Sequence, residues 1–329
     1  MFPFVVRRLI QMTLMLLFLS IVTFLLFSAV PTDPAALTCG KNCTPQVIAA
    51  NRTRLGLDKP LIIQYLTWFK GIFVGRTYGY GQAQFTCPAP CLGYSFRQQE
   101  NVTTLLMRAL PVTFYLAIGA FIIWMVVGIF SGIFAALHRG RWQDRGILGA
   151  TLIGYSLPTF FVGLVLLQFI VVRWNLLPYP DYISPMKDIV GFLQTMILPW
   201  IAVAILNAAY YTRLTRSQML DTLSNDFIRT ARAKGLPERV VIRKHAFRAG
   251  VTPIVTSAGL DFAGLLGGAV ITESVIGLPG IGRLAIDAVR DYDLPLLLGT
   301  TLLAASIIII AMAIVEILYV LIDPRVKLQ

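Results

Sequence analysis

The chain has 329 residues, of which 57% are hydrophobic and 13% charged, with a mean hydropathy of +0.73 and a formal net charge of +12. A chain with so little polar surface cannot coat a soluble globule of this size, so the composition excludes an ordinary soluble domain. We therefore expect most of the chain to lie in a lipid bilayer.

Six apolar segments are long enough to cross about 30 Å of hydrocarbon as helices. The first follows Arg7 and Arg8, as the core of a secretory signal peptide would. Its apolar run exceeds the usual signal core of about 7 to 15 residues, and the sequence after it is a poor cleavage site, so we interpret it as a retained anchor. The predicted spans are residues 9–30, 112–137, 147–172, 189–212, 251–272 and 296–322.

Basic residues are concentrated in alternate loops, and loops rich in Lys and Arg stay on the cytoplasmic side. The segment 213–250, called the charged loop below, carries nine basic and three acidic residues. Residues 273–295 carry two basic and four acidic residues. The bias predicts a multi-pass protein of the cell (inner or plasma) membrane with both termini in the cytoplasm. It also explains the net charge without a nucleic-acid partner.

The segment 31–110 then lies outside and is large enough for a small domain. It holds all four cysteines, Cys39, Cys43, Cys87 and Cys91, in two C-x3-C pairs. Such pairs suit either a metal site or disulfides, and we favour disulfides because thiols oxidise outside the membrane. Three connectivities are open. We expect no metal site in the chain.

Small residues and prolines recur inside the spans. Pairs of glycines four residues apart let helix backbones approach closely in lipid, and kinks at proline are tolerated inside a bundle. We interpret both as ordinary bundle packing rather than as a solute gate. These residues are Gly128 with Gly132, Gly264 with Gly268, Pro158 and Pro199.

Asp261 lies in the middle of the fifth span, where a charge is costly and normally faces a cavity or a partner. It is a candidate for the lining of a translocation pathway, with a buried structural hydrogen bond as the alternative. The segment after residue 272 mixes a Pro-Gly turn with apolar and charged residues, as a segment that dips into the bilayer would. Glu273, Pro279 and Gly280 of this segment are further pathway candidates.

The charged loop has the pattern of helix, sharp turn and helix. Leu220, Leu223, Phe227 and Ala231 form one predicted apolar stripe, while Arg216, Arg229, Arg232 and Lys234 take the other sides. Asn225 or Asp226 can cap a new helix, and Gly235 with Pro237 forces a break. Small residues occupy one side of this helix, at Ala231, Ala233 and Gly235. The helix can lie on anionic lipid, serve only to connect two spans, or dock into another protein.

Several ordered segments resemble one known family. "RTARAKGL" (residues 229–236) with "RKHAFRAGVTPIVT" (243–256) is similar to the cytoplasmic coupling loop of ABC-importer permeases of the dipeptide, oligopeptide and nickel group. "RRLIQMTLMLLFLSIVTFLLFSAVPTDPA" (7–35) resembles the first span of this family, and "ESVIGLPGIGRLAIDAVRDYDLPLLLG" (273–299) resembles one of its later landmarks.

The resemblance implies an all-α type I importer fold with six transmembrane helices. It divides the chain into residues 1–30 (N-terminus and first helix), 31–110 (extracytoplasmic domain) and 111–329 (permease domain). It also implies a homologous second permease, two ATP-binding cassette ATPase subunits and an extracytoplasmic binding protein as partners, with ATP and Mg on the ATPases. The implied coupling residues are Asp226, Arg229, Thr230, Ala231, Arg232, Ala233, Lys234, Gly235 and Leu236.

The chain lacks a G-x-x-x-x-G-K-[ST] phosphate loop, and we expect neither a catalytic residue nor a cofactor in it. Peptides are the commonest solute in the resembled family, with nickel or another small solute as alternatives. A secondary transporter would predict inverted repeats and several deep carboxylates, which the sequence does not offer. A membrane enzyme is disfavoured because the two histidines, His138 and His245, lie in cytoplasmic loops.

Overall fold

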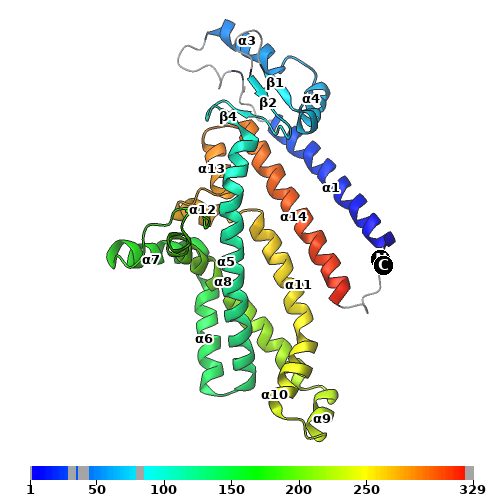
Figure 1. The fold of residues 1–329 in the computed structure, drawn as a ribbon, viewed down its shortest axis with the longest axis vertical. Coiled ribbons are helices and arrows are strands. Elements are labelled where there is room, and N and C mark those ends of the chain that lie inside the picture. Colours follow the sequence, from blue (N-terminus) through cyan, green and yellow to red (C-terminus); the bar gives the residue numbers. More distant parts are fainter. Residues whose placement is uncertain (1, 29–34, 36–43, 79–84, 323–329) are drawn as a thin grey trace. The chain divides into compact units, whose positions relative to one another are not determined.

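The computed structural model describes residues 2–28, 35, 44–78 and 85–322. The chain divides into two compact units, each of which we describe by itself. The first unit comprises Met1–Thr113 and Pro279–Ile310, and the second comprises Phe114–Leu278 and Ala311–Gln329. Two long helices, α5 (Val102–Leu137) and α14 (Leu294–Ile322), contribute residues to both units (Figure 1).

In the first unit, helix α1 (Phe2–Ser28) packs against α4 (Leu61–Val74). The contact is aromatic: the rings of Phe24 and Tyr65 lie 5.5 Å apart, and Trp68 lies 5.8 Å from Phe24. A hydrogen bond of 2.9 Å joins the hydroxyls of Ser20 and Tyr65. Aromatic side chains with a polar end suit a site where an apolar helix meets a wetter neighbour.

The predicted outer segment contains short elements between α1 and α5. Helix α3 (Pro45–Leu55) begins at the Thr44 cap and ends at Gly56, which has a φ of +72°. Two antiparallel hairpins follow. They pair β1 (Arg76–Tyr78) with β2 (Phe85–Cys87) and β3 (Tyr94–Ser95) with β4 (Glu100–Asn101).

Cys87 and Cys91 form a disulfide beside the buried Tyr78. The connectivity that the sequence left open is therefore local at this pair. Cys39 and Cys43 lie outside the described residues, so their predicted bridge stays a prediction.

The beginning of α5 meets α13 (Ile281–Arg290) and α14 in an apolar cluster of Val102, Leu106, Ala288 and Leu296. Beside it, the Thr113 hydroxyl accepts a hydrogen bond of 2.9 Å from the backbone N–H of Ile281 at the start of α13. The segment after residue 279 therefore forms a short amphipathic helix that packs into the first unit.

The second unit is arranged around α8 (Ile189–Leu223), whose first turn is capped by the Asp188 carboxylate at 3.0 Å from the N–H groups of Val190 and Gly191. Helices α6 (Trp142–Ser156), α7 (Thr159–Leu166), α11 (Phe247–Leu266) and α12 (Val270–Ile276) all pack against it. The remaining elements are the π-helical turns η2 (Leu167–Arg173) and η3 (Val241–Ala246) and the short helices α9 (Asp226–Ala233) and α10 (Glu238–Val240).

Five helices in the described part of the chain are long and apolar enough to span a membrane, and a bent pair brings the number to six. This agrees with the six predicted spans. The predicted span 147–172 is not one straight helix, however, because α6 and the segment Thr159–Arg173 meet at 98°. Leu157 is extended there because the ring of Pro158 disfavours the helical conformation at the preceding residue.

The two glycine pairs behave differently. A Cβ on Gly132 would lie 2.6 Å from the Thr215 Cβ and 2.7 Å from the Thr212 carbonyl oxygen, so α5 and α8 pack in contact there, as predicted. The same expectation is wrong for Gly264 and Gly268. A Cβ on Gly264 meets no atom of the described chain within 4 Å, and Gly268 has a φ of +118° after the end of α11.

Candidate functional site

Helix α8 contains the first residues of the charged loop and stops within it, after Leu223. Ser224 ends α8, and Asn225 adopts an extended backbone before α9 starts at Asp226. The carbonyl of Asn225 accepts a hydrogen bond of 3.1 Å from the N–H of Ile228 and so opens the new helix. Asn225, one of the two caps that the sequence predicted, therefore takes the N-cap position, and α8 does not continue into α9.

Helix α9 ends in a left-handed turn at Gly235, whose φ is +74°. The N–H of Gly235 bonds the carbonyl of Arg232 at 2.9 Å, and the N–H of Leu236 reaches the carbonyl of Ala231 at 3.4 Å. Pro237 then precedes α10. Glycine is needed here for its backbone conformation and not for close packing, because a Cβ at this position meets no described atom within 4 Å.

One face of α9 is buried within the second unit. Ile228 and Ala231 join an apolar cluster with Met219 of α8 and with Val241 and Ala246 of η3. The predicted stripe is therefore confirmed at Ala231, which packs on the same cluster as Leu220 and Leu223, and wrong at Phe227, which is 46% exposed. Because Ala231 is buried, the predicted small side of the helix is wrong at this residue. The break at Asn225 changes the helical phase, so residues after it no longer follow the spacing set by α8.

The other face of α9 is exposed and basic. It presents Arg229, Thr230, Arg232, Ala233 and Lys234, with Asp226 in the first turn. Arg232 forms an exposed ion pair with Glu238 of α10, with N–O distances of 2.7 and 3.2 Å. The hydrogen bond from Arg232 to Glu238 raises the pKa of the Arg232 guanidinium. The Arg232–Glu238 ion pair thus connects α9 and α10, the helices on either side of the turn at Gly235.

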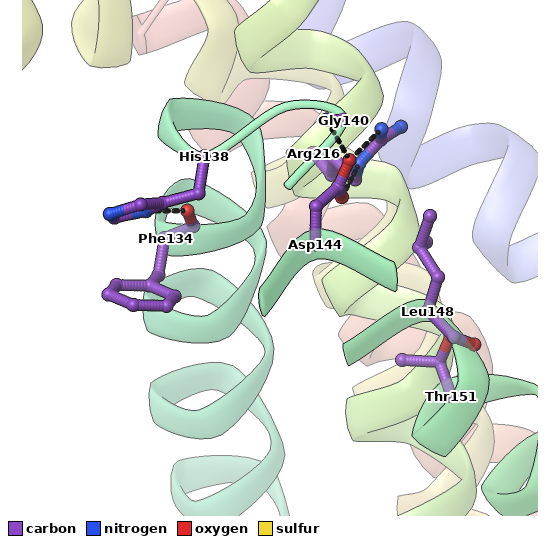
Figure 2. A network of polar contacts seen from close by, with 7 residues as sticks. All are labelled: Phe134, His138, Gly140, Asp144, Leu148, Thr151 and Arg216. Atoms are coloured by element: carbon purple, nitrogen blue, oxygen red, sulfur yellow. Dashed lines mark hydrogen bonds and ion pairs between the residues drawn. The ribbon is translucent and has the colours of Figure 1, made fainter. Parts of the chain in front are cut away.

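A buried ion pair stabilises the base of the charged loop (Figure 2). Arg216 of α8 donates from Nε to Oδ1 of Asp144 at 2.6 Å and from a terminal nitrogen to Oδ2 at 2.8 Å. The backbone N–H of Gly140 donates to the same Oδ2 at 2.9 Å. The Asp144 side chain is only 4% exposed and that of Arg216 is 21% exposed.

Sequence reasoning missed this pair. It grouped Arg216 with the exposed basic residues of the loop. The available signal was the single acidic residue, Asp144, among the basic residues Arg139, Arg141 and Arg145. An isolated acid in a basic turn indicates a specific partner, but only the packing of α6 on α8 identifies which arginine it binds.

The predicted pathway residues are divided between the two units. Asp261 on α11 accepts a hydrogen bond of 2.6 Å from the hydroxyl of Tyr211 on α8. Glu273 is fully buried on α12, in the same unit. Pro279 and Gly280 belong to the first unit, where Gly280 precedes the first residue of α13.

Two family models match the chain. One, described as binding-protein-dependent transport system inner membrane component, covers residues 128–328, and its N-terminal companion covers residues 1–117. Together they include nearly every element described above, the charged loop among them.

Individual proteins agree with these models. A Brucella abortus protein, named as a peptide transport system permease, is 35% identical over 98% of both chains. The dipeptide transport system permease protein DppB of Escherichia coli K12 is 34% identical over 99% of both chains. A solved structure of the MetNI methionine ABC transporter aligns with a TM-score of 0.56 at 14% identity, over 68% of this chain and 98% of that one.

The structural likeness supports the type I importer fold, and the sequence likeness extends over the whole length of the chain. The chain therefore belongs to the binding-protein-dependent transport system inner membrane component family, the multi-pass permeases of ABC importers.

Proposed function

We propose that the chain is the permease subunit of an ATP-driven importer of di- and oligopeptides. Relatives about a third identical over the full length are named as peptide or dipeptide permeases, and this observation carries the proposal. The chain forms half of the translocation pathway, and a homologous second permease forms the other half. An extracytoplasmic binding protein delivers the solute, and the termini of the chain lie in the cytoplasm.

The charged loop is the proposed contact with one of two ATPase subunits, which hydrolyse ATP bound with Mg. Helix α9 presents basic side chains outward and is fixed on its inner face by Ile228 and Ala231. A helix held firmly on one face can transmit movement of a bound partner to α8 and η3 without bending on its own. The residues proposed to couple are Asp226, Arg229, Thr230, Arg232, Ala233, Lys234, Gly235 and Leu236, with Ala231 as the inner anchor.

The test is reconstitution of the chain with a second permease, two ATPase subunits and a binding protein of the same transport system, in liposomes with ATP on the ATPase side. We expect a labelled dipeptide to accumulate only with hydrolysable ATP. A matched preparation with an inactive ATPase is the control. Dipeptide accumulation driven by a proton gradient without ATP would contradict the proposal and favour a secondary transporter. Uptake of labelled nickel but not of dipeptide would contradict the proposal that peptides are the solute.

A further inference from the structure

Asp261 is the only charged residue between Arg248 and Glu273 in the sequence. It lies on α11, within a helical segment long and apolar enough to span the membrane. An ionised carboxylate in such a position is costly unless it meets a partner or a water-filled space. Its presence therefore calls for a specific chemical reason.

The neighbours of Asp261 hold it in place without neutralising its charge. The Tyr211 hydroxyl donates to Oδ2 at 2.6 Å, and the Tyr211 side chain is fully buried and stacked at 6.5 Å on the Trp124 ring. Tyrosine contributes one neutral hydrogen bond. No basic side chain among the described residues lies within 4.0 Å of the Asp261 carboxylate, and the residue itself is exposed.

The Asp261 carboxylate is fixed through one oxygen, has no basic neighbour among the described residues and is exposed. Such a carboxylate is suited to bind a cation. An ammonium group offers three hydrogen-bond donors and one positive charge, which match the remaining acceptor positions of the carboxylate. A small peptide carries such a group at its amino terminus. The buried Tyr211 side chain keeps the hydrogen bond to Oδ2 in one orientation and so leaves the other oxygen of the carboxylate available.

We propose that Asp261 binds the α-ammonium group of the peptide as the peptide crosses the membrane. The inference rests on the proposed function and specifies which group of the peptide this chain recognises. The same cationic chemistry has a second source, a lysine or arginine of another subunit, and the experiment below separates the two.

The experiment uses the complete importer in liposomes and measures labelled dipeptide uptake at saturating binding protein. We expect Asp261→Asn and Asp261→Cys to lower maximal uptake by about tenfold or more, because the peptide ammonium group loses the carboxylate with which it pairs. Co-purification of the second permease should be unchanged. Loss of the second permease from either variant would overturn the proposal and assign the cation to another subunit.

The charge itself is tested by chemical modification of Asp261→Cys with two methanethiosulfonate reagents of similar size. The sulfonatoethyl reagent restores a negative charge, and we expect it to recover uptake several-fold, whereas the aminoethyl reagent should not. Leu260→Cys, at the adjacent exposed position, is the matched control and should respond equally to both reagents. The unmodified chain, treated in the same way, controls for the four native cysteines.

Equal uptake after the two reagents, or no modification of Asp261→Cys from water, would overturn the inference. Uptake by Asp261→Asn at the level of the unmodified chain would do the same. Each of these outcomes is distinct from failure of the proposed function, in which the unmodified importer would not accumulate dipeptide at all.

Discussion

Arg216 and Asp144 bind each other through two parallel hydrogen bonds, although they are 72 residues apart in the chain. The pair joins α8 to the first turn of α6, and the Gly140 N–H adds a third bond to the carboxylate (Figure 2). Arg216 lies one turn before Met219, which packs under α9. The ion pair therefore fixes the part of α8 that leads into α9.

Removing one partner of this pair should destabilise the second unit more than removing both. We expect Asp144→Ala to lower the free energy of unfolding by about 3 to 5 kcal/mol, because it leaves a largely buried guanidinium without a counter-charge. The double variant Asp144→Leu with Arg216→Met should show a smaller decrease in the free energy of unfolding. Unfolding in mixed micelles measures both, and Asp287→Ala, which breaks an exposed pair with Arg283 at 3.8 Å, is the control with little effect. A larger loss in the double variant would contradict the expectation.

The turn at Gly235 should tolerate residues according to their cost in the left-handed conformation. A β-branched side chain is costly at a φ of +74°, at about 1 to 3 kcal/mol, whereas asparagine is accepted more readily. We expect Gly235→Val to lower peptide uptake and transport-stimulated ATPase activity, with Gly235→Asn close to the unmodified chain. Gly149→Val is the matched control, since a Cβ there also meets no described atom and its φ is ordinary. Normal uptake by Gly235→Val would exclude a coupling role for this turn.

The predicted orientation can be measured with single thiols. Gln98 and Ser224 are both exposed and lie on opposite predicted sides of the membrane. A membrane-impermeant maleimide added outside intact cells should label Gln98→Cys and leave Ser224→Cys unlabelled until the cells are opened. Thiols at Gln64 and Gln143, predicted outside and inside respectively, are half-buried and serve as slower second probes. The reverse pattern would overturn the orientation derived from the basic loops.

The disulfides can be assigned by tryptic mass mapping without reduction. The Cys87–Cys91 bridge lies within one tryptic peptide, residues 77–97, which should be lighter by two hydrogens than its reduced form. With these two paired, Cys39 and Cys43 remain for each other, and cleavage after Lys41 should leave two peptides joined. Loss of the Cys87–Cys91 bridge should cost about 2 kcal/mol by the chain-entropy relation for so short a loop. Four free thiols, or a metal released with them, would contradict this assignment.

Asp293 should make the first unit less stable as the pH rises. Burial raises the pKa of its carboxyl group, which accepts hydrogen bonds from the Ser95 hydroxyl and the Leu296 N–H. The folded state therefore holds this proton more tightly than the unfolded state. The protonated carboxyl group makes its full contribution to the free energy of unfolding below the pKa of the unfolded state, about 3.9, and this contribution is lost as the pH rises through the pKa of the folded state. We expect Asp293→Asn to flatten the dependence of unfolding free energy on pH in that window. An unchanged slope would contradict this account.

The sequence alone determined the membrane class, the apolar spans and the helix–glycine–helix pattern of the charged loop. These depend on local properties: the length of apolar runs, the conformation that glycine permits, and the restriction that Pro237 imposes on the chain. The glycine pair at Gly128 and Gly132 was predicted correctly because close helix approach in lipid depends on residue size at a fixed spacing.

Only the tertiary structure decided which side chains meet. The residues of the Asp144–Arg216 pair are brought together by the packing of α6 on α8, which no spacing along one helix encodes. Tyr211 and Asp261 come together in the same way, from α8 and α11. The exposure of Phe227 follows from the break at Ser224 and Asn225, because α9 starts as a new helix and places Ile228 and Ala231 on the buried cluster instead.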